Sequence, residues 1–338
     1  MIITTWQQAG DESMKSLTNG LTIEKLNGHC AIQDQGRDHQ QHLGFSGSGA
    51  ADLYAFYSAN KLLSNSLNCA ALEVMMGQIQ LKANNTCTFA ITGADCFAQI
   101  NGLDIKHWQV HTLYKGDCLT LKQPKNNIYT YIAIAGGINS TPWLDSQSQT
   151  YTEQKLAFGH PALKVGSDIP VTHLATGSTI KSQQAGQTTN AQLPESFYQH
   201  PLLTLRFMPS PLWHKMTTQQ QRFFLQQTFS ISPNSNRMGY RLANKNPLTQ
   251  LSKPMTVLES NKLSKPVCYG AIQLPAFNSP LILMKERQTI GGYPNIGTVM
   301  QTDLYRLSQM RPGEQVKFIT TTIAQAQQQL ATFNARFQ

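Results

Sequence analysis

Three carboxylates in the first quarter of the sequence have the surroundings of a general base. Asp34 and Asp52 lie near the two ends of a polar, glycine-rich stretch, QDQGRDHQQHLGFSGSGAAD, at residues 33–52. Glu73 lies in the apolar run NCAALEVMMG, where a carboxylate is either half exposed at a sheet edge or buried with a partner or a raised pKa. Each of these groups could accept a proton from a substrate. Asp52 would also cap a helix that begins directly after it.

The same stretch contains residue types that bind polar or anionic molecules. Glycine lets a backbone N–H approach a ligand closely, and arginine binds carboxylates and phosphates through paired hydrogen bonds. The candidates here are Arg37, His42, Ser48 and Gly49. A turn held by Asp and Ser side chains would have the same composition, so both interpretations stay open.

A second polar loop, ISPNSNRMGYRL at residues 231–242, precedes a strand-like segment. Asn236 and Arg237 could bind a carboxylate or a phosphate there. An Asn-rich turn with a surface arginine is the alternative.

The stretch ERQTIGGYPNIGT, residues 286–298, has the glycine spacing of a phosphate-binding loop. Thr298 stands where that loop requires lysine, Pro294 and Ile296 interrupt it, and we expect no helix to start at Thr298. The residues therefore predict either a Gly-Gly turn or a β-hairpin substrate loop in which Gly291 and Gly292 bring backbone N–H groups close to an anion.

Metal and biotin sites are not predicted. The pairs His39–His42 and His107–His111 lack a cysteine or carboxylate at ligand spacing, and two strand residues four apart lie about 13 Å from each other. Biotin attaches to a Met-Lys pair on an exposed hairpin, whereas Met284–Lys285 continues a strand-like run.

Short segments rich in β-branched and aromatic residues predict a mainly β fold. TCTFAI, DCLTLK, IYTYIAIAGGI, LLTLRFM, AIQLPAF and PLILM are each bounded by turn-forming residues, and the N-G pair of INGLDI predicts a hairpin. Helices are predicted only in DLYAFYSANKLLS, TTQQQRFFLQQTF, with Thr217 and Gln220 as a capping box, and TIAQAQQQLATFNARF. A polar segment at about 176–194 predicts a linker between domains 1–190 and 191–338.

Charge and composition limit the class of protein. Hydrophobic residues make up 40% and charged residues 13%, which is typical of a folded chain rather than a disordered one. Residues 1–190 contain 12 Lys and Arg against 13 Asp and Glu, whereas residues 191–338 contain 15 against 5. The basic half suggests an acidic small molecule, and no nucleic-acid motif appears. Without an apolar leader or membrane span, the expected location is the cytoplasm.

Several motifs together resemble the allophanate hydrolase subunit 2 family. They are, in order, QDQGR…QHLGFSGSGAAD, NCAALEVMMG, ITGAD, YIAIAGGI, SPNSNRMGYRL, GAIQLP and ERQTIGGYPNIGTV…DLYRLSQMRPGE. This family includes the C-type subunit of 5-oxoprolinase, the regulatory protein KipA and the carboxyltransferase domain of urea carboxylase. The resemblance covers residues 22–318.

The resemblance implies two cyclophilin-like β-barrel domains with an active cleft between them. It further implies an ATP-dependent complex with a KipI-like B-type subunit and a LamB-like A-type subunit, in which ATP is supplied to the complex and no biotin is attached. By position in the motifs, the implied catalytic residues are Asp34, Asp52, Glu73 and Arg287. The implied substrate-binding residues are Arg37, His42, Ser48, Gly49, Asn236, Arg237, Gln273, Gln288, Thr289, Gly291, Gly292 and Tyr293.

Three functions follow from the resemblance. The first is ring opening of 5-oxoproline to glutamate, with the chain as the C-type subunit of a 5-oxoprolinase. The second is transfer of a carboxyl group from carboxybiotin to urea or a related amide. The third is a regulatory binding role of the KipA type, which is suggested by departures from the family pattern around Ala51 and Ile290.

Overall fold

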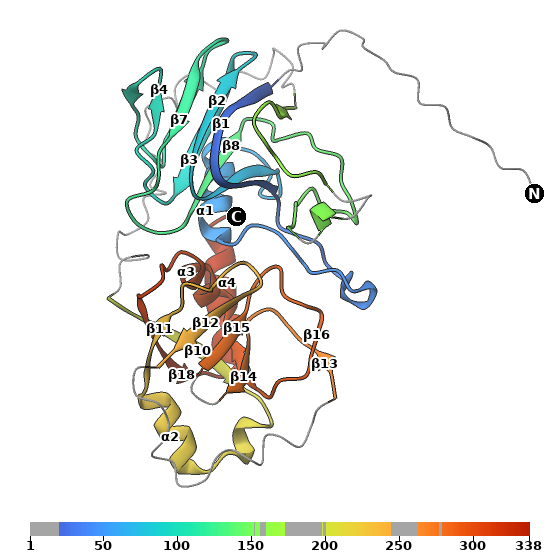
Figure 1. Ribbon diagram of the computed structural model, residues 1–338, viewed down its shortest axis with the longest axis vertical. Coiled ribbons are helices and arrows are strands. Elements are labelled where there is room, and N and C mark those ends of the chain that lie inside the picture. Colours follow the sequence, from blue (N-terminus) through green and yellow to red (C-terminus); the bar gives the residue numbers. More distant parts are fainter. Residues whose placement is uncertain are drawn as a thin grey trace, which may run out of the picture.

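The computed structural model describes residues 20–151, 153–155, 160–172, 198, 201–244, 263–276 and 279–338. Two β structures stand one above the other along the long axis of the molecule (Figure 1). The predicted linker and the boundary at residue 190 lie outside the described residues, so the proposed division into domains stays a prediction.

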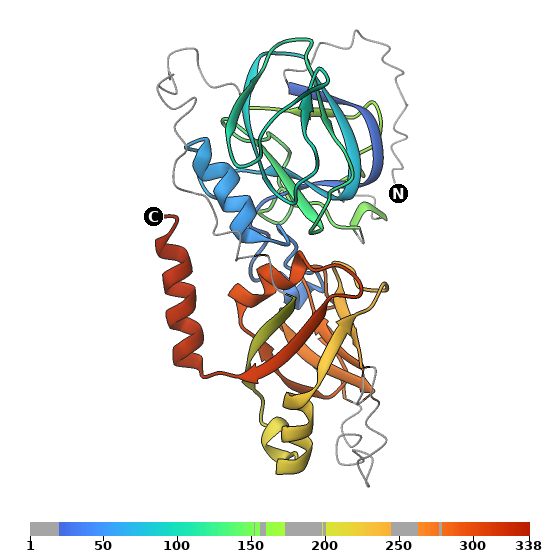
Figure 2. The same ribbon diagram turned by 90° about the vertical axis from the view of Figure 1, so that its left-hand side faces the viewer.

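The first half is a nine-stranded sheet that curves around its own core (Figure 2). The central strand β2 pairs antiparallel with β1, β7 and β8, which buries an aliphatic cluster between them. The N-G pair does form a hairpin, in which Asn101 and Gly102 have φ of 51° and 83°. The strands are β1 (Gly20–Gln33), β2 (Ala71–Ala83), β3 (Cys87–Gly93), β4 (Gln99–Ile100), β5 (Leu103–Asp104), β6 (Val110–Leu113), β7 (Cys118–Leu121), β8 (Tyr129–Ile134) and β9 (Asp168–Pro170).

The second half is a closed seven-stranded barrel, which a parallel pairing of its first and last strands completes. A separate two-stranded ribbon, β13 (Lys265–Pro266) with β16 (Ile290–Gly291), lies beside it. The barrel strands are β10 (Leu202–Pro209), β11 (Thr228–Ile231), β12 (Gly239–Ala243), β14 (Ala271–Ala276), β15 (Ser279–Leu283), β17 (Asn295–Val299) and β18 (Gln315–Thr320).

Four α-helices surround these sheets: α1 (Leu53–Leu62), α2 (Thr218–Gln226), α3 (Gln301–Ser308) and α4 (Ile323–Ala335). Asp52 caps α1 through the backbone N–H groups of Tyr54 and Ala55, and Thr217 with Gln220 forms the predicted capping box. Three short 3-10 helices, Gln41–Leu43, Glu153–Lys155 and Trp213–Lys215, complete the described elements. The prediction of a mainly β chain with two β units and few helices is confirmed.

The carboxyl-terminal helix joins the two halves. In Figure 2, α4 runs from the barrel back alongside α1 of the first half. Phe333 of α4 is buried and lies 6.2 Å from the ring of Tyr54 and 5.1 Å from that of Tyr305. The Lys61 ammonium donates to the carbonyl oxygen of Arg336 at 2.5 Å. One apolar cluster therefore contains residues of both halves.

One expectation about residues 286–298 needs correction. No helix starts at Thr298, as expected, because Thr298 lies in strand β17, and α3 begins three residues later. The segment does not form a hairpin with itself, however, because Ile290–Gly291 pairs with Lys265–Pro266 while Asn295–Val299 pairs with β10 and β14. The partner of Ile290 is Pro266, 24 residues earlier in the chain, so no local turn motif could predict this pairing.

We expect Phe318→Ala to destabilise the barrel. Phe318 is fully buried, and its ring centroid lies 5.0 Å from that of Phe224 and 6.0 Å from that of Phe207. Truncating a buried Phe costs about 3–5 kcal/mol of unfolding free energy. Equilibrium denaturation measures the loss, and Tyr114→Ala, at a side chain that is 64% exposed, serves as a control with little effect. Equal stability of the two variants would contradict the packing described.

Candidate functional site

Arg237 connects the two halves through a buried charge cluster. It precedes β12 in the barrel, and its guanidinium forms ion pairs with Glu73 on β2 of the first half and with Glu286, at 2.5 Å, in the loop after β15. Its Nη2 also donates to the carbonyl oxygen of Gly49 at 2.7 Å. Burial lowers the pKa of Arg237, but the two carboxylates outweigh burial and raise it well above its usual value. The cation is therefore permanently charged.

Glu73 is buried with partners, which is one of the two alternatives left open by the sequence. Besides pairing with Arg237, it accepts hydrogen bonds from the Ala51 backbone N–H at 2.9 Å and the Tyr131 hydroxyl at 2.7 Å. The role of Glu73 as a general base stays a prediction. The carboxylate could accept a proton only by weakening one of these contacts.

Asp52 lies at the junction as well as at the start of α1. Its Oδ2 accepts from the Tyr198 hydroxyl and from Gln309 Nε2, the latter at 2.9 Å. Burial raises the pKa of Asp52 to about 6, against the opposing effect of these hydrogen bonds. Gln309, directly after α3, also accepts from the backbone N–H groups of Ile128 and Tyr129 at 2.9 and 2.8 Å, so it joins the second half of the chain to the first.

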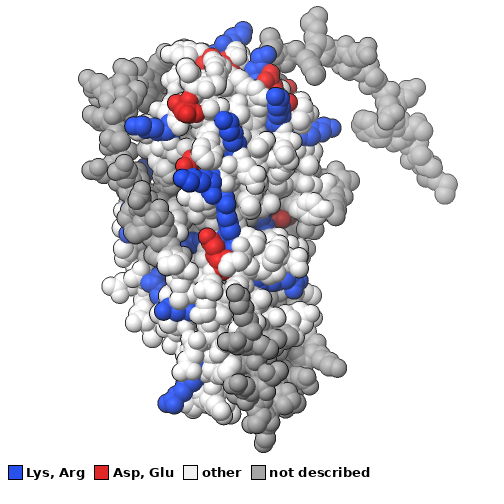
Figure 3. All heavy atoms as spheres, turned by 60° about the vertical axis from the view of Figure 1, so that its left-hand side comes forward, with Lys and Arg blue, Asp and Glu red and all other residues white. Residues whose placement is uncertain are grey.

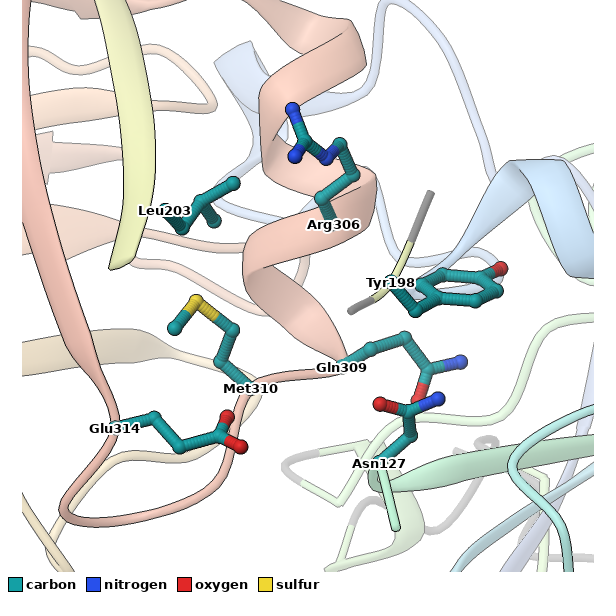
Figure 4. Close-up of a pocket in the computed structure, with 7 residues that line it drawn as sticks. All are labelled: Asn127, Tyr198, Leu203, Arg306, Gln309, Met310 and Glu314. Carbon is teal, nitrogen blue, oxygen red and sulfur yellow. The ribbon is translucent and has the colours of Figure 1, made fainter. Parts of the chain in front are cut away.

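A small pocket opens beside this junction (Figure 4). Tyr198 and Gln309, which both donate to Asp52, extend in the same direction there, and the pocket lies between α3 and the first half. The lining residues are Asn127, Tyr198, Leu203, Arg306, Gln309, Met310 and Glu314. None of the residues that the sequence predicted for the site is among them.

The polar loop of the first half is held by its own hydrogen bonds. Asp34 accepts from the hydroxyls of Ser146 and Ser148 at 2.7 and 2.5 Å, and from the Gly36 and Gln147 backbone N–H groups at 2.8 and 2.7 Å. The Arg37 guanidinium pairs with Glu153 at 2.6 and 3.0 Å. These contacts position the loop and occupy the Asp34 carboxylate and both terminal nitrogens of Arg37, and of these two side chains only Arg37 Nε has no hydrogen-bond partner among the described residues.

A second polar cluster lies between this loop and the ribbon β13–β16, and we call it the Lys285–Gln273 cluster. Lys285 and Arg287 follow β15, and their charged groups lie 5.2 and 5.9 Å from the ring centroid of Tyr269. Arg287 Nε donates to the Val267 carbonyl oxygen at 3.4 Å. Ser48 of the first half donates its backbone N–H to the Lys285 carbonyl oxygen at 3.2 Å. The cluster is therefore built by both halves of the chain.

Several buried polar atoms of this cluster have no hydrogen-bond partner among the described residues. They are Gln273 Nε2 and Oε1, the Tyr269 hydroxyl and the Ser48 hydroxyl. A buried polar group without a partner costs about 1–3 kcal/mol, so such groups are rare and require an explanation. Burial, followed by the charges of Arg237 and Arg287, lowers the pKa of Lys285 to about 8. An unpaired amide, a guanidinium and an easily deprotonated amine are suited to binding a small polar anion.

The remaining predicted residues are divided between this cluster and the surface. Gly291 lies on the ribbon against Gln273, and Thr289 accepts from the Val267 backbone N–H at 3.0 Å. Gln288 is half-buried beside them, while Gly292 and Tyr293 are exposed. His42 is exposed on a 3-10 helix, and Asn236 stabilises its own turn through the Met238 and Gly239 backbone N–H groups. The role of each in binding stays a prediction.

Lys285, Tyr269 and Gln309 were not among the residues predicted for the site. For Lys285, only biotin attachment was weighed from the sequence. The signal that could have found it is the run KER, which places three charged residues directly after an apolar strand. Tyr269 and Gln309 carry no comparable signal, since their importance depends on distant partners. Among the residues described, no group of three His, Cys, Asp or Glu could hold a metal ion. No helix in the described parts of the chain is long and apolar enough to cross a membrane.

We expect Arg237→Met to lower the free energy of unfolding by about 3–5 kcal/mol, because two buried carboxylates lose their cation. Chemical denaturation of the wild type and the variant measures the difference. A triple variant, R237M/E73Q/E286Q, removes all three charges and should recover much of the loss. If the triple variant is no more stable than the single variant, the charge cluster is not the origin of the effect.

Lys285 should titrate near pH 8. A folded pKa below the value of 10.5 for the free side chain means that the unfolded chain binds more protons between these pH values, so Lys285 makes the free energy of unfolding rise with pH across that range. Reductive methylation with ¹³C-formaldehyde followed by NMR gives the midpoint directly. Lys285→Arg identifies the resonance by removing it, and a midpoint above pH 10 would contradict the environment described.

Comparison with known proteins places the chain in a family. Residues 43–320 match the model of the carboxyltransferase domain, subdomain A and B. The C-type subunit of the 5-oxoprolinase of Escherichia coli (strain K12) is 31% identical over 310 residues, which cover 90% of this chain and 93% of that protein. The urea amidolyase of Saccharomyces cerevisiae is 25% identical over 299 residues, but this chain covers only 16% of it.

A solved structure agrees with the fold. The crystal structure of the K. lactis urea amidolyase matches 96% of this chain with a TM-score of 0.80 at 19% identity, and this chain spans 20% of that structure. Together with the family model and the Escherichia coli relative, this confirms the resemblance seen in the ordered sequence motifs. The chain belongs to the carboxyltransferase domain family, subdomains A and B, whose members include the C-type 5-oxoprolinase and urea amidolyase proteins just named.

Proposed function

We propose that this chain is the C-type subunit of an ATP-dependent 5-oxoprolinase, which opens 5-oxoproline to glutamate. The observation that carries the proposal is the nearly full-length correspondence with the C-type 5-oxoprolinase relative of Escherichia coli, 93% of which is covered. The match to urea amidolyase involves only a sixth of that longer protein. A cytoplasmic complex with KipI-like and LamB-like subunits is part of the same proposal.

The Lys285–Gln273 cluster has the chemistry that this reaction needs. 5-Oxoproline carries a carboxylate and a lactam, and the transition state of lactam opening places more negative charge on the carbonyl oxygen. Arg287 remains protonated although burial lowers its pKa, so its guanidinium can bind the carboxylate or the developing charge. Lys285, with a pKa of about 8, can hold or release a proton near neutral pH.

Opening a stable lactam is unfavourable unless it is coupled to another reaction, and phosphorylation of the amide oxygen by ATP would supply that coupling. This chain lacks the lysine of a phosphate-binding loop in residues 286–298, and strand β17 occupies that position. We therefore assign much of the ATP site to the partner subunits. Within this proposal, the chain orients the lactam and neutralises its charge.

Carboxyl transfer is the second candidate, and the name of the matched family favours it. The same cluster would then receive urea or another amide, and the carboxyl group would come from carboxybiotin on a separate carrier. Competition by a carboxybiotin analogue for the site distinguishes the two candidates, since lactam opening predicts no competition. A KipA-like regulatory role predicts partner binding that does not depend on Arg287.

The proposed function is tested by purifying this chain with its two partner subunits and measuring glutamate released from 5-oxoproline and ATP. We expect turnover by the wild-type complex and a loss of kcat/KM of about 100-fold or more in Arg287→Ala, because a buried charged contact to the reacting group is removed. Arg222→Ala, on the exposed side of α2, is the matched control and should leave turnover unchanged. Absence of turnover with all three subunits present would refute the function, and normal turnover by Arg287→Ala would refute this location of the site.

A further inference from the structure

Gln273 is a buried polar side chain whose amide makes no hydrogen bond to the described residues of the fold. It lies on β14, where Ile272 and Leu274 on either side face the barrel interior, so Gln273 points to the outer surface of the barrel. Its exposed fraction is 0%, and within the described parts of the chain neither its Nε2 nor its Oε1 has a hydrogen-bond partner. Gln309 provides the contrast, since its buried amide makes four hydrogen bonds.

The ribbon β13–β16 covers this amide. A Cβ placed on Gly291 would lie 2.6 Å from Gln273 Nε2, so the glycine backbone rests almost directly on the carboxamide. Only two residue pairs, Lys265–Gly291 and Pro266–Ile290, join the strands of the ribbon, and Pro266 has no N–H to donate. Ile290 is 58% exposed, so the outer side of the ribbon is not buried by the described residues. Hydrogen bonds from the Val267 N–H to the Thr289 carbonyl oxygen and from the Leu274 N–H to the Pro294 carbonyl oxygen also hold this segment, so a molecule seated against Gln273 must displace Gly291 from the carboxamide.

The cations of the cluster border the same place. Val267 contacts the position of a Gly291 Cβ at 3.3 Å, and its carbonyl oxygen accepts from Arg287 Nε. Among the described residues the Arg287 side chain makes no other hydrogen bond, which leaves its terminal nitrogens available to an anion. A molecule seated under the ribbon would therefore meet a free carboxamide on one side and a guanidinium on the other.

We propose that Gln273 is the residue that recognises the amide of the substrate, by pairing edge to edge with a cis amide under the ribbon β13–β16. A lactam holds its C=O and N–H on the same side, as a carboxamide holds its oxygen and its amino group. Gln273 Nε2 would donate to the lactam oxygen, and the lactam N–H would donate to Gln273 Oε1. This one pairing gives both Gln273 Nε2 and Gln273 Oε1 a hydrogen-bond partner. Arg287 binds the carboxylate of the same substrate molecule.

This pairing selects among small amides. A trans amide presents its C=O and N–H on opposite sides and can satisfy only one of the two atoms. Urea has the required cis edge but no carboxylate for Arg287. Since the identity of the ligand rests on the proposed function, 5-oxoproline is the expected occupant and urea is the other outcome that an experiment must separate.

The test uses the assembled complex without ATP and measures the binding of 5-oxoproline, of its lactone analogue with a ring oxygen in place of N–H, and of urea. Wild type should bind the lactone about tenfold more weakly than the lactam, because Oε1 loses its donor. Gln273→Leu should weaken lactam binding by about tenfold or more and should bind the lactam and the lactone equally. Gln273→Glu, of the same size, keeps the acceptor and should show the same loss of affinity.

Thermal stability separates recognition from a structural role. Gln273→Leu removes two unsatisfied atoms, so its melting temperature should stay equal or rise. Gln309→Leu, which loses four hydrogen bonds, should melt at a clearly lower temperature. Unchanged lactam affinity in Gln273→Leu, or a melting temperature that falls as far as that of Gln309→Leu, would overturn the inference.

Glutamate release by the wild-type complex reports on the proposed function separately. If wild type turns over 5-oxoproline and Gln273→Leu has the same KM, the inference fails and the function stands. If wild type releases no glutamate but binds urea in a manner that depends on Gln273, the function fails and amide recognition stands. Failure of wild type to bind any of the three molecules would overturn the inference as well.

Discussion

The buried cation of Arg237 is the interaction on which the arrangement of the two halves depends. A guanidinium can be removed from water only when carboxylates and carbonyls replace its hydration. Here Glu286 comes from the same half as Arg237 and Glu73 comes from the first sheet, so Glu73 keeps its cation only if the two halves are docked. The contact of Gly49 with the same guanidinium extends this requirement to the glycine-rich loop. A shift of either half would leave a buried charge uncompensated.

The docking determines the electrostatics of the neighbouring cluster. Lys285 lies beside Glu286 in sequence and is buried close to Arg237 and Arg287, so its amine becomes easier to deprotonate. The like charges are tolerated because Glu73 and Glu286 are already in place. The structural ion pairs and the candidate site thus share residues, and a change to one alters the other.

The excess of Lys and Arg in the second half indicates less about a binding surface than the composition suggested. Part of it is buried at the junction as Arg237, Lys285 and Arg287. On the face shown in Figure 3, the described Lys and Arg side chains are distributed over both halves, and the described Asp and Glu side chains lie mostly among those of the upper half. The excess of positive charge is consistent with a site for a small anion, and it is not gathered into one continuous surface on that face.

The sequence alone determined the local structure and the family. Asp52 as a helix cap, the Thr217–Gln220 capping box, the N-G hairpin and the strand-rich pattern depend on neighbours within a few residues, so they could be predicted and are confirmed. Helix α3 was missed because no side chain caps its first turn.

Only the tertiary structure decided which polar side chains already have hydrogen-bond partners within the described chain and which do not. Asp34 and Arg37 have the residue types of a site, yet their partners, Ser148 and Glu153, lie more than a hundred residues away and occupy the Asp34 carboxylate and the two terminal nitrogens of Arg37. Gln273 was implied for the site only by its position in a motif, and its unpaired amide becomes apparent only when Gly291 is found lying across it. Hydrogen-bond satisfaction depends on contacts between distant segments, and no local pattern in the sequence encodes those contacts.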